Sequence, residues 1–100
     1  MFSLYRTRDS AGDSGGRSDL LIPIYDSTNK VIDVKVEHNA KPAVGGVMRV
    51  GSNYTRSYSA SDWWQTTLIT EILEDKIESN GVRIVRFKTT NSEYIWKGKV

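Results

Sequence analysis

Apolar and β-branched residues alternate with polar ones most regularly in the C-terminal third of the chain, where two turn signals separate three runs. The first signal is the Asn-Gly pair at Asn80, whose two residues both tolerate positive φ and so favour a β-hairpin. The second is the Thr-Asn pair at Thr90, between the runs Val82–Thr89 and Ser92–Lys97. This pattern predicts three consecutive antiparallel strands joined by tight turns.

A two-residue loop at the second turn sets the register of its hairpin. One face of the hairpin then becomes aromatic and apolar, while the other face carries an opposite-charge pair. Cross-strand pairs of these kinds each contribute about 0.2–1 kcal/mol, so the pattern is typical of a half-buried hairpin. The expected pairs are Thr89 with Ser92, Phe87 with Tyr94, Val85 with Trp96 and, on the charged face, Lys88 with Glu93.

The first turn allows two registers that differ in loop length. A two-residue loop would place Glu74 opposite Phe87 and so set a charge on the apolar face. A three-residue loop, with Gly81 left-handed at a bulge, places Leu73 opposite Phe87 instead. It also places Glu74 opposite Arg86. Because the second register separates apolar from charged side chains, it is the one we expect.

The segment Leu68–Ile77 has a competing interpretation as a helix. Its apolar residues also fit a helical stripe, and Ser61 could cap a helix that ends at Gly81. Against this, the residues from Thr66 to Ile72 are rich in β-branched side chains. The hairpin signal also requires a strand before the turn. We therefore expect a strand, with the helix as the alternative.

Three further strand patterns lie in the first half of the chain. Leu20–Tyr25 is apolar but contains Pro23, which removes one ladder donor and favours an edge strand or a strand end. Val31–Glu37 alternates and predicts a half-buried strand that forms a hairpin with the preceding run. Val47–Val50, bounded by glycines, predicts a short strand. The fold class we expect is mainly β, a small six-stranded partly open barrel or sandwich of the SH3-like or OB-like kind.

Residues 1–19 are polar and contain a Gly- and Ser-rich run. Such a segment buries too little apolar surface to offset its ordering entropy. We interpret it as a flexible tail before a single small β domain of residues 20–100. Alternatively, Phe2, Leu4 and Tyr5 could add a short edge strand or dock on a partner.

Composition narrows the class of protein. The 100 residues include no cysteine, which excludes disulfides, thiolate catalysis and Cys-type zinc sites. The net charge of +2 is small, but acidic residues concentrate in Asp62–Glu78 and basic ones in Arg83–Lys99. We expect a solvated surface of mixed charge, with the pairing of this charge between neighbouring strands as the alternative. The sequence has no signal-peptide pattern and no apolar run near the ~20 residues of a membrane span, so we expect a soluble, cytoplasmic protein.

The titratable residues do not form an enzyme motif. His38 is the only histidine and has no partners at metal-ligand spacing, so a surface histidine is expected. No serine lies in a nucleophile motif, and the glycine pairs match neither a Walker loop nor a dinucleotide fingerprint. Glu74 and Asp75 would point to opposite faces of a strand. We expect no catalytic residues, no metal and no cofactor.

The polar segment between residues 53 and 65 is the best candidate for a binding site, because it mixes aromatic and basic side chains. Rings can stack on nucleic-acid bases while basic residues meet phosphates, and the same residue types form protein–protein hot spots. Alternatively, at least one of its tryptophans fills the barrel end. The candidate residues are Arg49, Tyr54, Arg56, Tyr58, Trp63 and Trp64, with Arg83, Arg86 and Lys88 as a second, basic face.

Three segments in this region share a pattern with other proteins. They are SASDWWQTT at residues 59–67, TEI at residues 70–72 and FKTTNSEY at residues 87–94. The pattern resembles that of small uncharacterised bacterial and phage proteins, over roughly Gly46 to Trp96. This resemblance implies a compact β domain of mobile-element origin. Small phage proteins commonly bind a host protein, so it also favours a protein partner.

Three functions fit these observations. The first is a non-enzymatic protein-binding module, phage- or mobile-element-encoded, that modulates or inhibits a host enzyme. The second is a single-stranded nucleic-acid-binding barrel that uses the aromatic segment and the basic face. The third is a small structural subunit of a larger assembly. We expect a host protein or a second copy as partner, with nucleic acid as the alternative and no membrane.

Overall fold

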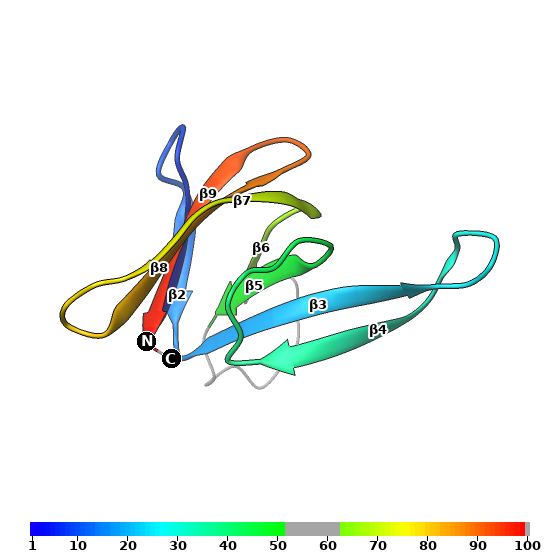
Figure 1. Ribbon diagram of the computed structural model, residues 1–100, viewed down its shortest axis with the longest axis horizontal. Helices are drawn as coiled ribbons and strands as arrows, with labels where there is room; N and C mark the ends of the chain where they lie inside the picture. Colours follow the sequence, from blue (N-terminus) through cyan, green and yellow to red (C-terminus); the bar gives the residue numbers. More distant parts are fainter. Residues whose placement is uncertain (52–62, 100) are drawn as a thin grey trace.

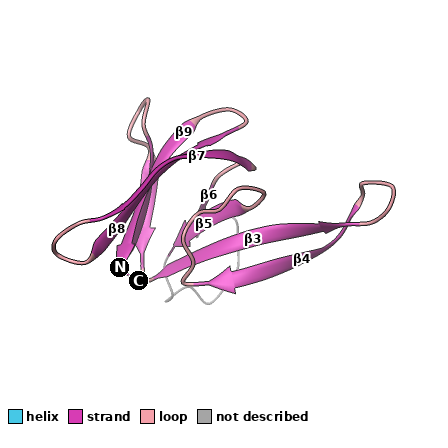
Figure 2. Ribbon diagram, in the orientation of Figure 1, coloured by secondary structure: helices cyan, strands magenta, loops and turns pink. Residues whose placement is uncertain are grey.

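The computed structural model describes residues 1–51 and 63–99, which form nine β-strands and no helix (Figure 1, Figure 2). The strands lie in two antiparallel sheets, one ordered β2-β1-β9-β8-β7 and the other β4-β3-β5-β6. The strands are β1 (Phe2–Arg6), β2 (Gly12–Gly15), β3 (Arg17–Tyr25), β4 (Val31–His38), β5 (Val47–Gly51), β6 (Trp63–Gln65), β7 (Ile69–Ile77), β8 (Val82–Thr89) and β9 (Glu93–Lys99).

The predicted mainly-β class is confirmed, and the helix considered for Leu68–Ile77 is wrong, because this segment contains β7. The described strands make two separate sheets rather than one closed barrel. The structure adds three strands to the six expected, namely β1, β2 and β6. The SH3-like or OB-like assignment stays a prediction.

The hydrophobic core of the described residues draws side chains from both sheets. On β8 and β9, alternate residues are buried, as the period of two of a strand with one buried face requires. Burial of apolar surface contributes about 25 cal/mol per Å² and is the main favourable term in holding the sheets together. The buried cluster consists of Phe2, Leu4, Leu20, Met48, Val50, Ile69, Val85, Phe87, Tyr94 and Trp96.

A buried hydrogen bond joins the two sheets at Trp96 of β9. Its indole Nε1–H donates to the hydroxyl of Ser18 on β3 at 2.9 Å, and that hydroxyl donates to the carbonyl of Ala40 at 3.0 Å. Trp96 and Ser18 are both fully buried, and the Trp96 ring stacks on Phe2 at a centroid distance of 5.9 Å. The apolar surface of the indole is therefore buried, and its polar N–H is hydrogen-bonded.

The N-terminal segment is not the flexible tail that its composition predicted. Residues 1–19 contain β1, β2 and the first part of β3, and β1 lies between β2 and β9. Phe2 and Leu4 point to one face of β1 and are buried, as in the alternative that these residues join the sheet. Phe2 lies opposite Gly98, where a Cβ atom would come within 2.4 Å of the Phe2 ring.

Polar residues between β1 and β2 form an ordered turn. The Arg6 guanidinium donates to the Asp9 carboxylate at 2.6 and 3.0 Å, and the Ala11 amide donates to it at 3.1 Å. Ser10 takes the left-handed conformation with φ of 57°. The Arg6 hydrogen bond, assisted by the Ala11 amide, lowers the pKa of Asp9 to about 2. The segment is ordered despite its polar composition, because these polar side chains hydrogen-bond locally and two apolar side chains, Phe2 and Leu4, reach the core.

The predicted hairpin of β8 and β9 is confirmed residue by residue. Phe87 pairs with Tyr94 and their rings stack at 5.5 Å. The pairs Val85 with Trp96 and Lys88 with Glu93 are also as predicted. The turn residues and the alternating pattern were enough to predict this register, because the two strands are adjacent in sequence.

The hairpin of β7 and β8 also follows the preferred register near its turn. Gly81 is left-handed with φ of 85°, the Glu78 amide donates to the Val82 carbonyl, and Glu74 lies opposite Arg86. The expected position of Leu73 opposite Phe87 is wrong. A bulge between Ile72 and Glu74 places Ile72 there instead, since one extra residue on β7 shifts all pairs beyond it.

The hairpin of β3 and β4 projects from the two sheets (Figure 1). Strand β5 pairs with β3 only as far as Leu21, which lies opposite Val47. Strand β4 continues to pair with β3 as far as Tyr25, opposite Val31. We call residues 22–36, which extend beyond the end of β5, the arm.

Candidate binding surface

The aromatic segment proposed as the site falls largely outside the described residues. This applies to Tyr54, Arg56 and Tyr58. The backbone of Trp63 and Trp64 forms part of β6 and pairs with β5, but their side chains also lie outside the description. The interpretation of this segment as a site or as a core plug therefore stays a prediction.

The basic face proposed on β8 is paired with acidic neighbours. The Arg83 guanidinium donates two hydrogen bonds to Asp75 on β7, at 2.7 and 3.1 Å. Lys41 donates to the same carboxylate at 3.0 Å. The hydrogen bonds from Arg83, with a further one from Lys41, hold the pKa of Asp75 below its usual range. Arg83 is thus engaged within the fold.

The other two basic residues of β8 lie opposite acidic ones in the sheet. Arg86 is opposite Glu74 on β7, and Lys88 is flanked by Glu71 on β7 and Glu93 on β9. The acidic and basic strands thus lie side by side, as in the alternative in which they pair much of their charge. Alternating signs on neighbouring strands leave little net field for attracting a phosphate chain.

Arg49, the remaining predicted site residue, belongs to a charge cluster around a buried carboxylate. Asp19 on β3 is only 1% exposed, and Arg49 on β5 donates to it at 3.0 Å. His38 on β4 lies 3.0 Å from its other oxygen through Nδ1, and Arg17 approaches to 3.5 Å. The structure thus brings together two guanidinium groups and an imidazole from three strands.

This cluster has a structural role that the sequence did not reveal. Asp19 ended the segment interpreted as a tail, so nothing marked its carboxylate as buried. A buried charge is tolerated when it is paired and hydrogen-bonded, as Asp19 is. The side chain of His38 remains 64% exposed, which agrees with the expected surface histidine. We interpret the cluster as a clamp that holds β3, β4 and β5 in register at the base of the arm.

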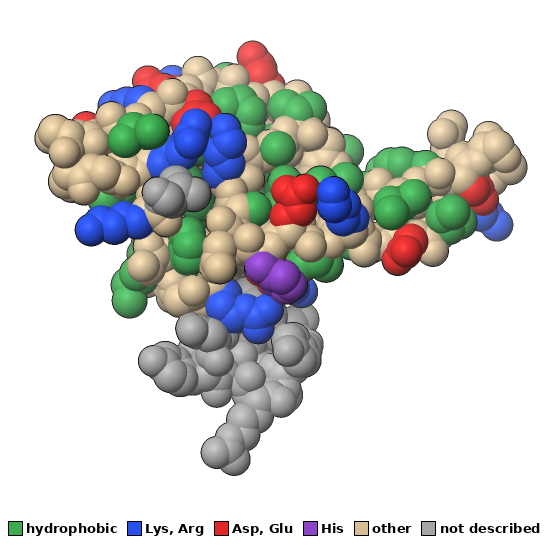
Figure 3. Space-filling view, turned by 60° about the horizontal axis from the view of Figure 1, so that its bottom comes forward, with side chains coloured by type: hydrophobic (Ala, Val, Ile, Leu, Met, Phe, Trp, Pro, Cys, Tyr) green, Lys and Arg blue, Asp and Glu red, His purple; other side chains and the backbone are tan. Residues whose placement is uncertain are grey.

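The arm carries the largest group of exposed apolar side chains among the described residues. Hydrophobic side chains gather along it in the space-filling view (Figure 3). The six residues are between 39% and 64% exposed, so the half-buried strand predicted for residues 31–37 is wrong in its burial. Beyond Leu21, β3 pairs with β4 alone among the described strands. These residues are Ile24, Tyr25, Val31, Ile32, Val34 and Val36.

The tip of the arm is an ordered turn built on Asp26. Its carboxylate accepts hydrogen bonds from the amide and hydroxyl of Thr28, at 2.8 and 2.7 Å, and from the Lys30 amide at 3.0 Å. Asn29 is left-handed with φ of 62°, as asparagine tolerates in turns. The Thr28 hydroxyl, followed by the Lys30 and Thr28 amides, lowers the pKa of Asp26 below its usual range.

This pKa shift predicts a pH-dependent tip. Because the folded-state pKa lies below the ordinary aspartate value of about 3.9, the turn is fully stabilised above that pH and loses the contribution as pH falls through the folded pKa. In an NMR titration, the Thr28 and Lys30 amide shifts should move together, below pH 3.9. The Asp26→Asn variant should lack this transition. A shared transition at or above the ordinary value would contradict the turn geometry.

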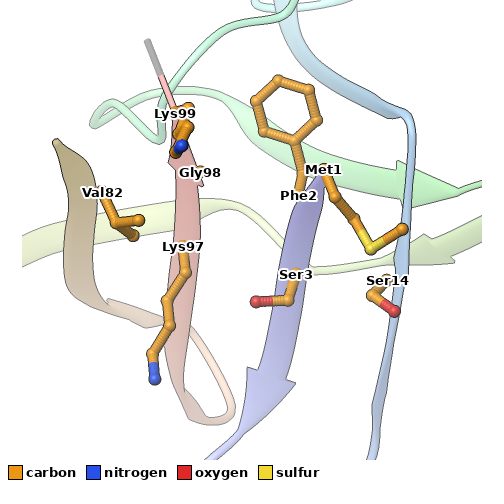
Figure 4. A pocket seen from close by; sticks show the side chains of 8 residues that line it. All are labelled: Met1, Phe2, Ser3, Ser14, Val82, Lys97, Gly98 and Lys99. Carbon is orange, nitrogen blue, oxygen red and sulfur yellow. The ribbon is translucent and has the colours of Figure 1, made fainter. Parts of the chain in front are cut away.

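A shallow hollow of about 370 Å³ lies at the other end of the molecule, where β1, β2 and β9 meet (Figure 4). Its lining is mainly apolar, with Met1, Phe2 and Val82, and includes the polar or basic side chains of Ser3, Ser14 and Lys97. The ammonium groups of Lys97 and Lys99 do not converge on one point (Figure 4). The hollow therefore lacks the converging polar groups that orient a small ligand.

In the part of the chain that the structure describes, no helix has the length and apolarity needed to cross a membrane. Comparisons with protein-family models, with curated proteins and with solved structures found no match for this chain. The resemblance to small bacterial and phage proteins stays a prediction. The arm and the charge cluster at its base are therefore the features of the described residues that bear on function.

Proposed function

We propose that this protein is a non-enzymatic protein-binding module and that the arm is its binding surface. The observation that carries the proposal is the set of six exposed apolar side chains on a two-stranded projection. Contiguous exposed apolar surface marks interaction sites, whereas single exposed apolar residues do not. The Asp26 turn at the tip and the Asp19 cluster at the base support the arm at both ends, so little conformational entropy is lost on binding.

The mode of binding we propose is strand addition at β4. This strand is an edge of its sheet, with β3 as its only neighbour among the described strands. An edge strand presents unpaired N–H and C=O groups that a partner strand can satisfy. Its side chains would then supply specificity, because they alternate between the two faces of the new pairing.

The finer features of this proposal come from the sequence. A partly open SH3-like or OB-like barrel is supported by the small size of the two sheets and their common core. A phage-encoded modulator of a host enzyme is supported by the resemblance over roughly Gly46 to Trp96. Nucleic-acid binding has weaker support than protein binding, because Arg83, Arg86 and Lys88 face acidic neighbours.

The proposal can be tested by capturing partners from lysate of the source cells with three baits. These are the wild type, the arm variant Ile32→Ser with Val34→Ser, and the control Arg86→Ser on β8. Retained proteins are identified by mass spectrometry and their affinities measured with purified components. We expect the arm variant to bind at least about tenfold more weakly, since the loss of apolar contacts costs about 1.4 kcal/mol or more. The control should bind as the wild type does.

Two outcomes would overturn the proposal. Equal affinity of the arm variant and the wild type would show that the partner binds elsewhere. A mobility shift on single-stranded DNA that weakens steeply with salt would favour the nucleic-acid alternative. All three baits should melt at similar temperatures, because the substituted side chains are exposed.

A further inference from the structure

The backbone of β4 exposes hydrogen-bonding groups at its free edge. The Val34 amide donates to the carboxylate of its neighbour Asp33, at 2.8 Å. On β3, Val34 lies opposite Pro23, which has no N–H to offer. In an antiparallel pair, the residue that is not bonded to its partner directs both N–H and C=O outward. The outward-directed residues in the regular part of β4 are therefore Val34 and Val36, whereas Ile32 is the extra residue of a bulge between Val31 and Asp33.

The side chains of β4 alternate in chemistry along this same edge. Val34 and Val36 share one face and are apolar, while Asp33, Lys35 and Glu37 share the other face, where the Lys35 ammonium lies 3.4 Å from the Glu37 carboxylate. Val34 and Val36 are 43% and 39% exposed. The edge thus combines free backbone groups, two apolar side chains and a row of charges of alternating sign.

We propose that the occupant of this edge is a second copy of the same chain, bound antiparallel about a two-fold axis at Val34. This inference rests on the proposed function of the arm. In this arrangement Val34 pairs with its own copy. Asp33 pairs with the partner's Lys35, so both symmetric pairs join opposite charges. Such an isologous interface closes on itself and gives a dimer rather than a fibre.

The charges select this register over its neighbours. A shift by two residues brings Lys35 against its own copy, or Asp33 against its own copy, and like charges directly opposite are destabilising. A shift by one residue sets apolar side chains opposite charged ones. Pairing centred on Val34 joins outward-directed residues to one another and sets Asp33 opposite Lys35 in both symmetric pairs. Asp33 then releases the Val34 amide to the partner's carbonyl and meets the partner's Lys35.

A charged residue on an edge strand usually discourages self-association. Here the order Asp33-Val34-Lys35 has the reverse effect, because antiparallel pairing inverts the order on the partner. A strand with two charges of one sign would repel its own copy. About the two-fold axis, the same two charges attract the second copy and favour self-association.

The experiment is a charge swap followed by sedimentation velocity over a wide range of protein concentration. The wild type should show a reversible monomer–dimer equilibrium. Asp33→Lys and Lys35→Glu should each dimerise on the order of tenfold to a hundredfold more weakly, because each makes both symmetric pairs repulsive. An equimolar mixture of the two variants should form a heterodimer, since every facing pair is then of opposite sign. The double variant D33K with K35E should dimerise as the wild type does.

Val34→Pro provides a matched control for the backbone. It removes an outward amide that β3 does not use, so the variant should fold and remain monomeric. A wild type that stays monomeric at all concentrations would overturn self-pairing, and a mixture that does not restore the dimer would overturn the register. If the wild type is monomeric but the arm variant binds a different protein more weakly than the wild type does, self-pairing is wrong and the protein-binding function stands. If it is monomeric and the arm variant keeps every partner, both proposals are wrong.

Discussion

Replacing Leu4 with alanine is expected to destabilise the protein by about 2–5 kcal/mol, the range for a buried leucine whose removal leaves a cavity. Leu4 is fully buried on β1 and lies opposite Trp96. The cavity would open in the core, on the buried face of the five-stranded sheet, where β1 lies between β2 and β9. Chemical denaturation followed by far-UV circular dichroism measures the change.

Tyr5→Ala is the matched control on the same strand. Tyr5 points to the opposite face and is 39% exposed, so its truncation should cost much less than that of Leu4. Deletion of residues 1–16 should have a larger effect than either substitution. It removes β1 and β2 together and exposes the edge of β9, so the shortened chain should not fold. A shortened chain that melts near the wild-type temperature would show that β1 does not contribute to the core.

Truncation of Trp96 to alanine is expected to cost about 3–5 kcal/mol, which is a large part of the ~5–15 kcal/mol of a small domain. The variant is expected to be largely unfolded at 25 °C. The loss has two sources: the apolar burial of the indole ring and its hydrogen bond to Ser18 across the two sheets.

Two milder variants separate these sources. Ser18→Ala leaves the ring in place but removes the acceptor of the buried indole N–H, which should cost about 1–3 kcal/mol. Trp96→Phe removes the N–H and part of the ring, so it leaves the Ser18 hydroxyl without the indole as donor. Urea denaturation of the three variants should therefore rank Trp96→Ala as the least stable. If Ser18→Ala were as stable as the wild type, the hydrogen bond would contribute nothing to joining the sheets.

One part of the candidate site could be predicted from the sequence, and the other part could not. The basic residues of β8 were correctly placed on one strand, and their pairing with acidic neighbours followed from the hairpin registers. The arm was missed as a surface. The alternation of Val31–Glu37 is the same whether its apolar face meets another layer or solvent, because period two reports only that two faces differ.

The C-terminal hairpins could be derived from local chemistry alone. Gly81 takes the left-handed conformation that the turn between β7 and β8 demands. In the β8–β9 hairpin, the alternating pattern allows one register that segregates Lys88 and Glu93 from Phe87 and Tyr94. Strands adjacent in sequence leave few competing arrangements once the turn is known. The one error, at Leu73, came from a bulge for which the pattern has no signal.

The burial of residues in the N-terminal strands and at the ends of the sheets depends on strands that are distant in the sequence. Phe2 belongs to the core because β1 pairs with β9, which brings it against Gly98 at the opposite end of the sequence. Asp19 is buried because Arg49 and His38 reach it from two other strands. The arm is exposed because β5 stops pairing at Leu21. Local propensity determines which residues form strands, whereas burial depends on which strands meet, and only the assembled sheets decide that.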